Sequence, residues 1–245
     1  DLVLGWSSWP DVFAAVGPRV AAEARSVVDG EVRVLPNGID PEAWRVEPRP
    51  GDPGTLRLVT VMRLQRRKRG RALLRAVAGA SRRLEGRAGV SLTVVGEGPE
   101  RWALQKLAAR LGIADRVRFE GYLPRPSVRD RYAASDVFVS ASVLESFGLA
   151  ALEARAAGLA VVGRSDPGLS AVVEDGRSGL LAPHDRGLED HLVRLALDPD
   201  HLERIRRHNR TAPPAHAWPA VVARHLESYG DALDRLDATN VGPSG

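Results

Sequence analysis

The sequence predicts an α/β fold: a doubly wound, Rossmann-like parallel sheet with helices on both faces, followed by C-terminal helices. Short apolar runs alternate with helical patterns of about 8 to 15 residues, which is typical of a parallel sheet. The runs are continuous rather than alternating, as expected for strands buried on both faces. The 245 residues, 44% hydrophobic and 27% charged, are enough to bury such a core.

Composition excludes several classes of protein. The chain has no cysteine, which excludes disulfides, thiolate metal sites and cysteine nucleophiles. No apolar run reaches the roughly 18 residues of a membrane span, and no signal-peptide pattern opens the chain, so a cytoplasmic location is expected. The net charge of +4 and the 5% of aromatic residues do not favour nucleic acid as a partner.

The first 50 residues precede the alternating pattern and are expected to form a separate segment. They hold the aromatic residues Trp6, Trp9 and Phe13, a helical pattern over 16–27 and a strand over 32–35. Residues 46–55 contain three prolines and two glycines, which is typical of a linker. The predicted division is therefore 1–50, 51–212 and 213–245.

The middle segment supplies the sheet. Strands are expected at 56–62, 90–95, 117–122, 136–140, 159–162 and 180–182, with helices between most of them at 71–85, 99–111, 126–134, 148–157 and 168–174. Beyond residue 187 the pattern is helical, with helices expected at 187–197, 199–209 and 216–236, the last two separated by Pro213-Pro214.

In such sheets, ligands bind at the carboxyl ends of the strands, so the strand-to-helix loops carry the candidate residues. Loop one (63–70) follows the first strand and holds five cations, among them Arg63 and Lys68. It is interpreted either as a phosphate clamp or as a solvated basic loop. Lys68 favours the clamp, because only two of the 35 basic residues are lysine.

Loops two and three give weaker signals. Loop two (95–99) contains Gly96 and Gly98 but lacks the third glycine of a dinucleotide fingerprint, so a ligand contact and a tight turn remain equally open. Loop three (121–124) offers Tyr122 and Leu123 as an edge for a nucleobase, or as core residues beside a turn.

Loop four (144–154) gives the strongest signal. Glu145 precedes a predicted helix, Gly148 lies at its start, and the amides near 148–150 are expected to form an anion site. Glu153 follows Gly148 by five residues, roughly 8 Å along the helix axis, which is similar to the separation of a phosphate from a ribose. A carboxylate there can accept hydrogen bonds from both ribose hydroxyls. The alternative is a solvated glutamate on an amphipathic helix.

Metal sites are not expected. All six histidines lie in the last quarter of the chain, and none has a metal-ligand spacing with a carboxylate. Asp198-Pro199-Asp200 has the form of a metal-sugar site but falls between C-terminal helices, where a helix stop is the simpler interpretation.

These motifs together resemble the C-terminal half of a retaining GT-B glycosyltransferase of the group-1 family (glycosyltransferase family 4). The resemblance covers residues 32–183 and, more loosely, the two ends. Its motifs are 34–40 (Val-Leu-Pro-Asn-Gly-Ile-Asp), Arg63-Leu64 with Lys68, 95–99 (Val-Gly-Glu-Gly-Pro), 117–121, Ser135-Asp136-Val137, 145–153, 157–162 and 175–181. Trp218 and Tyr229 resemble the family's closing helix.

The resemblance implies a domain that binds a nucleotide-diphosphate sugar as donor substrate, with no cofactor and no obligatory metal. It implies that Arg63 and Lys68 hold the diphosphate, that Glu145 and the backbone near Phe147, Gly148 and Leu149 hold the sugar and distal phosphate, and that Glu153 holds the ribose and loop three the base. It also implies that an acceptor-binding N-terminal domain or separate chain is needed, with membrane-surface contact only through that partner.

The chain departs from the family pattern at several places, and at one of them Arg155 replaces a small residue or methionine in the second turn of the loop-four helix. Met62 replaces a glycine, and Asp166-Pro167-Gly168 replaces a Gly-Gly pair. Arg69 stands between Lys68 and Gly70, so the role of the lysine could belong to Arg69 instead. Two other functions remain open: a non-catalytic nucleotide-binding module, and a dinucleotide-dependent oxidoreductase, against which the incomplete glycine fingerprint speaks.

Overall fold

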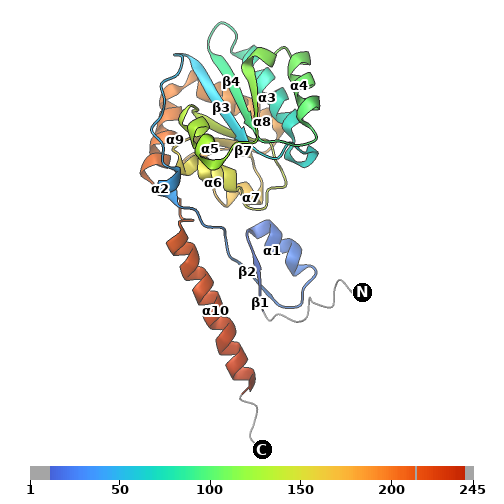
Figure 1. Ribbon diagram of the computed structural model, residues 1–245, viewed down its shortest axis with the longest axis vertical. Coiled ribbons are helices and arrows are strands. Elements are labelled where there is room, and N and C mark those ends of the chain that lie inside the picture. The colour runs from blue at the N-terminus through green and yellow to red at the C-terminus, as the bar shows by residue number, and fades with distance from the viewer. Residues whose placement is uncertain (1–11, 213, 241–245) are drawn as a thin grey trace, which may run out of the picture. The chain divides into compact units, whose positions relative to one another are not determined.

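The computed structural model describes residues 12–212 and 214–240 (Figure 1). Contacts divide the chain into two compact units, Pro41–Pro214 and the paired segments Asp1–Asp40 and Ala215–Gly245. Residues 41–50, which the sequence grouped with the N-terminal segment, lie in the larger unit. Trp6 and Trp9 lie outside the described residues.

The larger unit contains a six-stranded, fully parallel sheet. Its strands are β3 (Thr55–Val61), β4 (Gly89–Val95), β5 (Val117–Gly121), β6 (Val137–Ser140), β7 (Ala160–Arg164) and β8 (Gly179–Ala182). The spatial order β5-β4-β3-β6-β7-β8 is that of a Rossmann fold, which confirms the predicted fold class. The direction of winding reverses between β3 and β6, so the loops after these two strands meet at the switch point.

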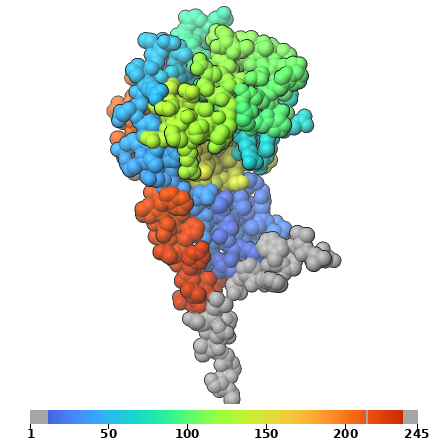
Figure 2. All heavy atoms as spheres, in the orientation of Figure 1, coloured from blue at the N-terminus to red at the C-terminus, as the bar shows by residue number. Residues whose placement is uncertain are grey.

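Helices cover both faces of the sheet (Figure 1), and in the space-filling view they hide most of it from solvent (Figure 2). They are α2 (Pro41–Trp44), α3 (Gly70–Arg83), α4 (Arg101–Arg110), α5 (Arg125–Ala133), α6 (Leu149–Ala156), α7 (Pro167–Ser170), α8 (Asp185–Leu197) and α9 (Pro199–Thr211), with the 3₁₀ turns η2 (Arg66–Lys68) and η3 (Ala114–Arg116). Helix α3 packs against α4 and α8 on one face, and right-handed crossovers place α5 and α6 on the other.

The apolar periodicity explains these positions. Leu73, Leu74 and Val77 of α3 are almost fully buried against the sheet, as their spacing of three and four residues requires. On the opposite face, Tyr132 of α5 is fully buried between Trp44 and Phe138, with ring centroids 5.8 and 6.5 Å away. Trp44 therefore anchors α2, a single turn that the sequence pattern did not reveal.

The Ser-Asp-Val motif at 135–137 has a structural explanation. Asp136 is buried, and both of its carboxylate oxygens accept hydrogen bonds from Arg57 of β3, at 3.0 and 2.8 Å. Arg206 of α9 lies 3.1 Å from the same carboxylate. A buried charge needs such paired donors, so the motif joins a central strand to the C-terminal helices rather than supplying a ligand contact.

One helix is shorter than expected. The pattern over 168–174 predicts two turns, but α7 ends at Ser170. The chain then turns toward β8, where the Ser178 hydroxyl accepts a hydrogen bond from the Glu174 amide at 2.8 Å. This local side-chain bond competes with continued helix.

The smaller unit consists of β1 (Val12–Ala15), α1 (Pro18–Arg25), β2 (Glu31–Val34) and α10 (Trp218–Asn240). Strand β1 was not predicted, because its four residues become a strand only by pairing with β2. A backbone bridge joins Ile39 to Ala217, and Gly38 packs so closely on the Trp218 ring that a Cβ there would lie 2.2 Å from it. Among the residues that the structure describes, none of the helices combines the length and the hydrophobicity of a transmembrane span.

Candidate functional site

Two loops meet at the switch point of the sheet and bring together two of the predicted site residues. Loop one follows β3 and loop four follows β6. The Lys68 ammonium lies 2.9 and 2.8 Å from the two carboxylate oxygens of Glu145. Both side chains are about four-fifths buried, at 19% and 22% exposure. A lysine and a glutamate separated by 77 residues thus form one charged pair at the carboxyl edge of the sheet.

The conformation of loop one determines which cation enters this pair. Residues 66–68 form the turn η2, and Arg69 follows with φ 55° and ψ 36°, the only non-glycine residue of the described chain with a positive φ. This left-handed conformation turns the Arg69 side chain away from Glu145, and its guanidinium pairs with Asp185 at 2.7 Å. Lys68, not Arg69, therefore faces Glu145.

Arg63 lies apart from this pair. Its side chain is exposed, and none of its hydrogen bonds or ion pairs involves another described side chain. A long exposed arginine beside Lys68 can move toward an anion, but the structure does not bring it into contact with Glu145.

A small cavity of about 40 Å³ lies beside the pair, lined among others by Lys68, Glu145 and Gly148. Gly148 has a φ of +84° and begins α6, so only a residue without Cβ adopts this step easily. The amides of the first turn of α6 lack partners within the helix and carry the positive end of its dipole. Phe147 is buried and anchors the loop, whereas Leu149 is exposed.

Glu153 lies further along α6 and is half-buried. Burial raises the pKa of its carboxyl to about 7, although the nearby Arg125 opposes this rise. Among the described residues, no side chain or backbone amide donates a hydrogen bond to the Glu153 carboxylate, whereas its backbone carbonyl accepts one from the Ala157 amide at 3.0 Å. A half-buried carboxylate whose donors are missing is suited to accept hydrogen bonds from a ligand.

Gly168 supports loop four, and the sequence motifs did not identify it. A Cβ at this position would lie 2.0 Å from the carbonyl oxygen of Glu145. Asp166 holds Gly168 in this position against Glu145, because its buried carboxylate accepts hydrogen bonds from the amides of Gly168 and Leu169 at 2.9 and 3.3 Å. The replacement of Gly-Gly by Asp-Pro-Gly therefore keeps the one glycine that the packing requires.

The glycines of loop two pack against loop one. A Cβ at Gly96 would lie 2.0 Å from the Met62 carbonyl oxygen, and one at Gly98 would lie 2.5 Å from that of Leu64. Backbone hydrogen bonds from Met62 to Val95 and from Leu64 to Glu97 join the same segments. This close contact accounts for both glycines, and Gly96 is not among the residues that line the cavity beside Lys68.

Loop three is anchored by its backbone. The Gly96 amide donates to the Gly121 carbonyl at 2.7 Å, and Gly121 has a φ of +78°. Tyr122 is 77% exposed and Leu123 is half-buried. The aromatic edge that the sequence suggested thus lies in solvent rather than in the core.

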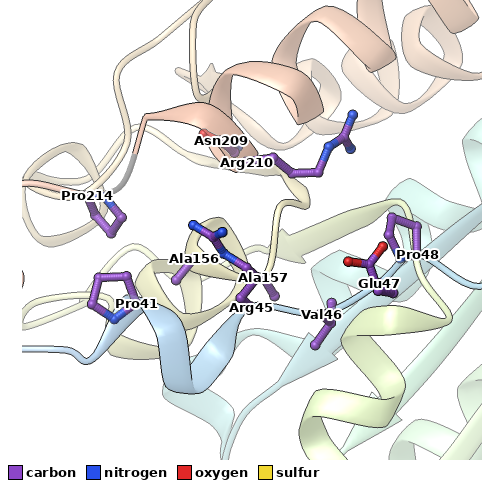
Figure 3. A pocket seen from close by; sticks show the side chains of 10 residues that line it. All are labelled: Pro41, Arg45, Val46, Glu47, Pro48, Ala156, Ala157, Asn209, Arg210 and Pro214. Atoms are coloured by element: carbon purple, nitrogen blue, oxygen red, sulfur yellow. The ribbon is translucent and has the colours of Figure 1, made fainter.

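A larger cavity, about 170 Å³, contains none of the predicted site residues (Figure 3). Ala156 and Ala157 line it at the C-terminal end of α6, which lies at the amino edge of the sheet because the helix runs antiparallel to the strands. Asn209, also in its wall, donates to the Leu159 and Ser178 carbonyls at 2.6 and 2.8 Å. Its amide thus holds two loops together.

Comparison with known proteins gives consistent results. The family described as glycosyl transferases group 1 matches residues 47–212. A D-inositol 3-phosphate glycosyltransferase of Thermobispora bispora is 35% identical over 97% of this chain and 60% of its own length. A protein of the same name from Thermomonospora curvata is 45% identical over 57% of this chain and 33% of its own length. The chain thus spans only part of these relatives.

Solved structures share the fold. HepE of Anabaena, in complex with UDP and glucose, has a TM-score of 0.76 and 19% identity, over 90% of this chain and 63% of its own. Sucrose-phosphate synthase of Thermosynechococcus elongatus has a TM-score of 0.77 and 25% identity, over 92% and 59%.

Proposed function

The chain belongs to the family of glycosyl transferases group 1, and from this premise we propose that it is the donor-binding half of an enzyme that transfers a sugar from a nucleotide diphosphate to an acceptor. The observation that carries the proposal is the Lys68–Glu145 pair at the switch point, on the loops where parallel sheets bind nucleotides. The acceptor site belongs to a further domain or chain, since the residues that motivate the proposal all concern the donor.

Lys68 and Arg63 serve the leaving group. When the bond between sugar and diphosphate breaks, negative charge develops on the diphosphate. A lysine held at the strand ends and the exposed Arg63 stabilise this charge, together with the N-terminus of α6 near Phe147, Gly148 and Leu149. Because these groups supply the positive charge, we propose a reaction that needs no metal.

Glu145 changes partner when the donor binds. In the structure its carboxylate holds Lys68. A diphosphate competes for that ammonium, and the released carboxylate then accepts hydrogen bonds from sugar hydroxyls. No second carboxylate adjoins Glu145 in the sequence, so a covalent sugar intermediate of the double-displacement type is not favoured, and we propose retention of configuration by attack from the face of the departing diphosphate.

Glu153 and loop three select the nucleoside. In the proposed complex, the half-buried Glu153 carboxylate accepts hydrogen bonds from the vicinal ribose hydroxyls, and Tyr122 and Leu123 of loop three, near Gly96, form the edge for the base. The relatives are named as D-inositol 3-phosphate glycosyltransferases, and HepE was solved with UDP and glucose. These names make UDP the first nucleotide to test as the donor's leaving group and a phosphorylated polyol the first acceptor to test.

Calorimetric titration with UDP, GDP, ADP and NAD tests the donor assignment. We expect one nucleoside diphosphate to bind more tightly than NAD, and Glu153→Ala to weaken it by about 1.5–3 kcal/mol, the range for a hydrogen bond to a charged group. Glu85→Ala, an exposed carboxylate elsewhere, is the matched control. Preferred binding of NAD would support the oxidoreductase alternative. If Glu153→Ala binds the nucleoside diphosphate as tightly as the wild type, Glu153 does not hold the ribose.

Joining the chain to an acceptor-binding domain of a relative tests catalysis. Transfer from the nucleotide-sugar with the same anomeric configuration in donor and product, read by the proton coupling of the anomeric centre, is the expected result. Inversion of the anomeric configuration would contradict the proposed retaining reaction. Binding without transfer would favour a non-catalytic nucleotide-binding module.

A further inference from the structure

Arg69 adopts a backbone conformation that an arginine does not favour. At φ 55° and ψ 36° it ends the turn η2 and begins α3, and every other described residue with positive φ is glycine. The Cβ of an L-residue crowds its own carbonyl in this region. Other contacts must therefore hold Arg69 there.

The Arg69 side chain supplies those contacts. Its two terminal nitrogens lie 3.0 and 2.7 Å from the two carboxylate oxygens of Asp185, a bidentate pair. One of them also donates to the Ala141 carbonyl at 3.3 Å. Arg69 is thus joined to the first residue of α8 and to the segment that leads into Glu145.

Asp185 is itself fixed by a second arginine. Arg164, the last residue of β7, pairs with Asp185 and donates to the carbonyls of Ala182 and Pro183 at 3.2 and 2.7 Å. Burial opposes ionisation of Asp185, but the hydrogen bonds from Arg69 and Arg164 outweigh it and keep the pKa of Asp185 below its usual value. The cluster therefore joins the carboxyl ends of four strands, β3, β6, β7 and β8.

We propose that Arg69 is a positioning residue: its bonds to Asp185 and the Ala141 carbonyl lock the turn 66–69, so that the Lys68 ammonium is held at Glu145, where the donor diphosphate binds. The turn carries both side chains: Lys68 reaches Glu145 in loop four, and Arg69 reaches Asp185 at the start of α8 and Ala141 just before loop four. A shift of Arg69 therefore displaces Lys68 directly. The diphosphate part of this proposal rests on the proposed function, whereas the locking of the turn does not.

Arg69→Gly separates positioning from folding. Glycine adopts the left-handed conformation without strain, so the backbone can keep its course while the bonds to Asp185 and Ala141 are lost. Arg66→Ala is the matched control, because it removes the same charge from the same turn and has no ion pair with a described residue. Asp185→Asn removes the other end of the bidentate pair.

Lysine acylation provides a readout that needs no ligand. The chain has only two lysines, and Lys106, on α4 over the Trp102 ring, serves as internal standard. Mass spectrometry should show Lys68 reacting several-fold faster in Arg69→Gly and in Asp185→Asn than in the wild type, with Lys106 unchanged and Arg66→Ala like the wild type. Unaltered Lys68 reactivity in Arg69→Gly would overturn the proposal.

Binding of inorganic pyrophosphate tests the functional consequence independently of the base. Arg69→Gly should weaken it by about five- to tenfold, and Lys68→Ala/Arg69→Gly should be no weaker than Lys68→Ala alone, because Arg69 acts through Lys68. Additive losses would mean that Arg69 touches the phosphate itself, which overturns positioning. If Lys68→Ala binds pyrophosphate normally, the proposed role of Lys68 in donor binding fails, and the acylation result still decides whether Arg69 positions it.

Discussion

Glu153 combines burial with the lack of an internal hydrogen-bond donor among the described residues, an unfavourable arrangement for a carboxylate. Such a group reduces stability and is retained where a ligand uses it. Its pKa of about 7 makes this conflict measurable, because the carboxyl changes charge within the accessible pH range.

Glu153→Gln should stabilise the protein at alkaline pH. The folded pKa lies above the unfolded value of 4.5, so the unfolded state loses the proton first as pH rises, and the wild type loses stability between about pH 4.5 and 7. Since glutamine has no charge to desolvate, we expect a gain of about 1–3 kcal/mol at pH 8, reduced from the full shift because the group is partly exposed, and almost none at pH 4. Urea unfolding at both pH values checks this. An equal gain at both would point to packing.

The affinity for a nucleotide-sugar should rise with pH. Ribose hydroxyls donate to the ionised carboxylate, so binding lowers the pKa of Glu153 and releases a proton near pH 7. The diphosphate of the sugar donor does not titrate there. Calorimetry of UDP-glucose in buffers of different ionisation enthalpy between pH 6 and 8 would detect the released proton, and Glu153→Gln should abolish it. Proton release that persists in the variant would assign the linkage to another group.

Glu145→Gln should separate diphosphate binding from sugar binding. The substitution removes the ionised partner of Lys68, which leaves the ammonium available to phosphate, so the affinity for UDP is expected to rise about two- to tenfold. The additional affinity of UDP-glucose over UDP should fall, because the amide accepts sugar hydroxyls less well. Calorimetric titration of the wild type and the variant with UDP and UDP-glucose gives the ratio of the two affinities. Equal losses for both would show that Glu145 only holds the loop.

At the scale of elements, the site depends on loops that touch through glycine. Gly96 and Gly98 admit the backbone of loop one, and Gly168 admits that of loop four. Each contact brings one strand-end loop against its neighbour where no Cβ fits. The glycines thus set the geometry from which Lys68 and Glu145 approach each other, without needing to touch a ligand.

Gly168→Ala should disturb the site more than the fold. The added methyl group meets the Glu145 carbonyl at 2.0 Å, and relieving this overlap must move loop four, at a cost of about 1–3 kcal/mol. Pyrophosphate affinity should fall because loop four leads into the N-terminus of α6, whose amides are proposed to bind the phosphate. Gly230→Ala in α10, where a Cβ meets nothing within 4 Å, is the control. Normal affinity and stability of Gly168→Ala would show that loop four moves without consequence.

At the scale of the whole molecule, α10 presents an apolar face to solvent. Trp218, Val222, Leu226, Tyr229 and Leu233 recur at helical spacing and are between 46% and 64% exposed. Phe13 of β1, by contrast, is half-buried. A continuous exposed apolar stripe on a helix favours association with another protein surface.

The isolated chain should therefore self-associate, bind donor weakly and transfer no sugar. In a site open to water, the charged side chains interact with the donor diphosphate through a high dielectric, which weakens their attraction. We therefore expect a dissociation constant for the donor in the high-micromolar to millimolar range, about −4 to −6 kcal/mol. Leu226→Glu should reduce self-association in sedimentation velocity without changing donor affinity. Efficient sugar transfer by the chain alone, abolished by Glu145→Ala, would contradict the assignment as half of an enzyme.

The sequence by itself determined the fold class and the candidate loops. Continuous apolar runs separated by helical patterns define strands β3 to β8 in order, because burial on both faces leaves a local signature. Lys68, Glu145 and Glu153 could be selected because their loops follow those strands. Short elements such as β1 and α2 could not be predicted, since four residues are too few to show a hydrophobic periodicity and their conformation depends on residues distant in the sequence.

Only the tertiary structure decided how these residues meet. The choice of Lys68 over Arg69 depends on one left-handed step at Arg69, stabilised by Asp185, 116 residues away. The raised pKa of Glu153 depends on burial beneath neighbouring elements, and the need for Gly168 on a carbonyl 23 residues earlier in the chain. Local sequence patterns record which residues face a core, whereas close approach, desolvation and charge pairing arise between segments that meet only when the chain has folded.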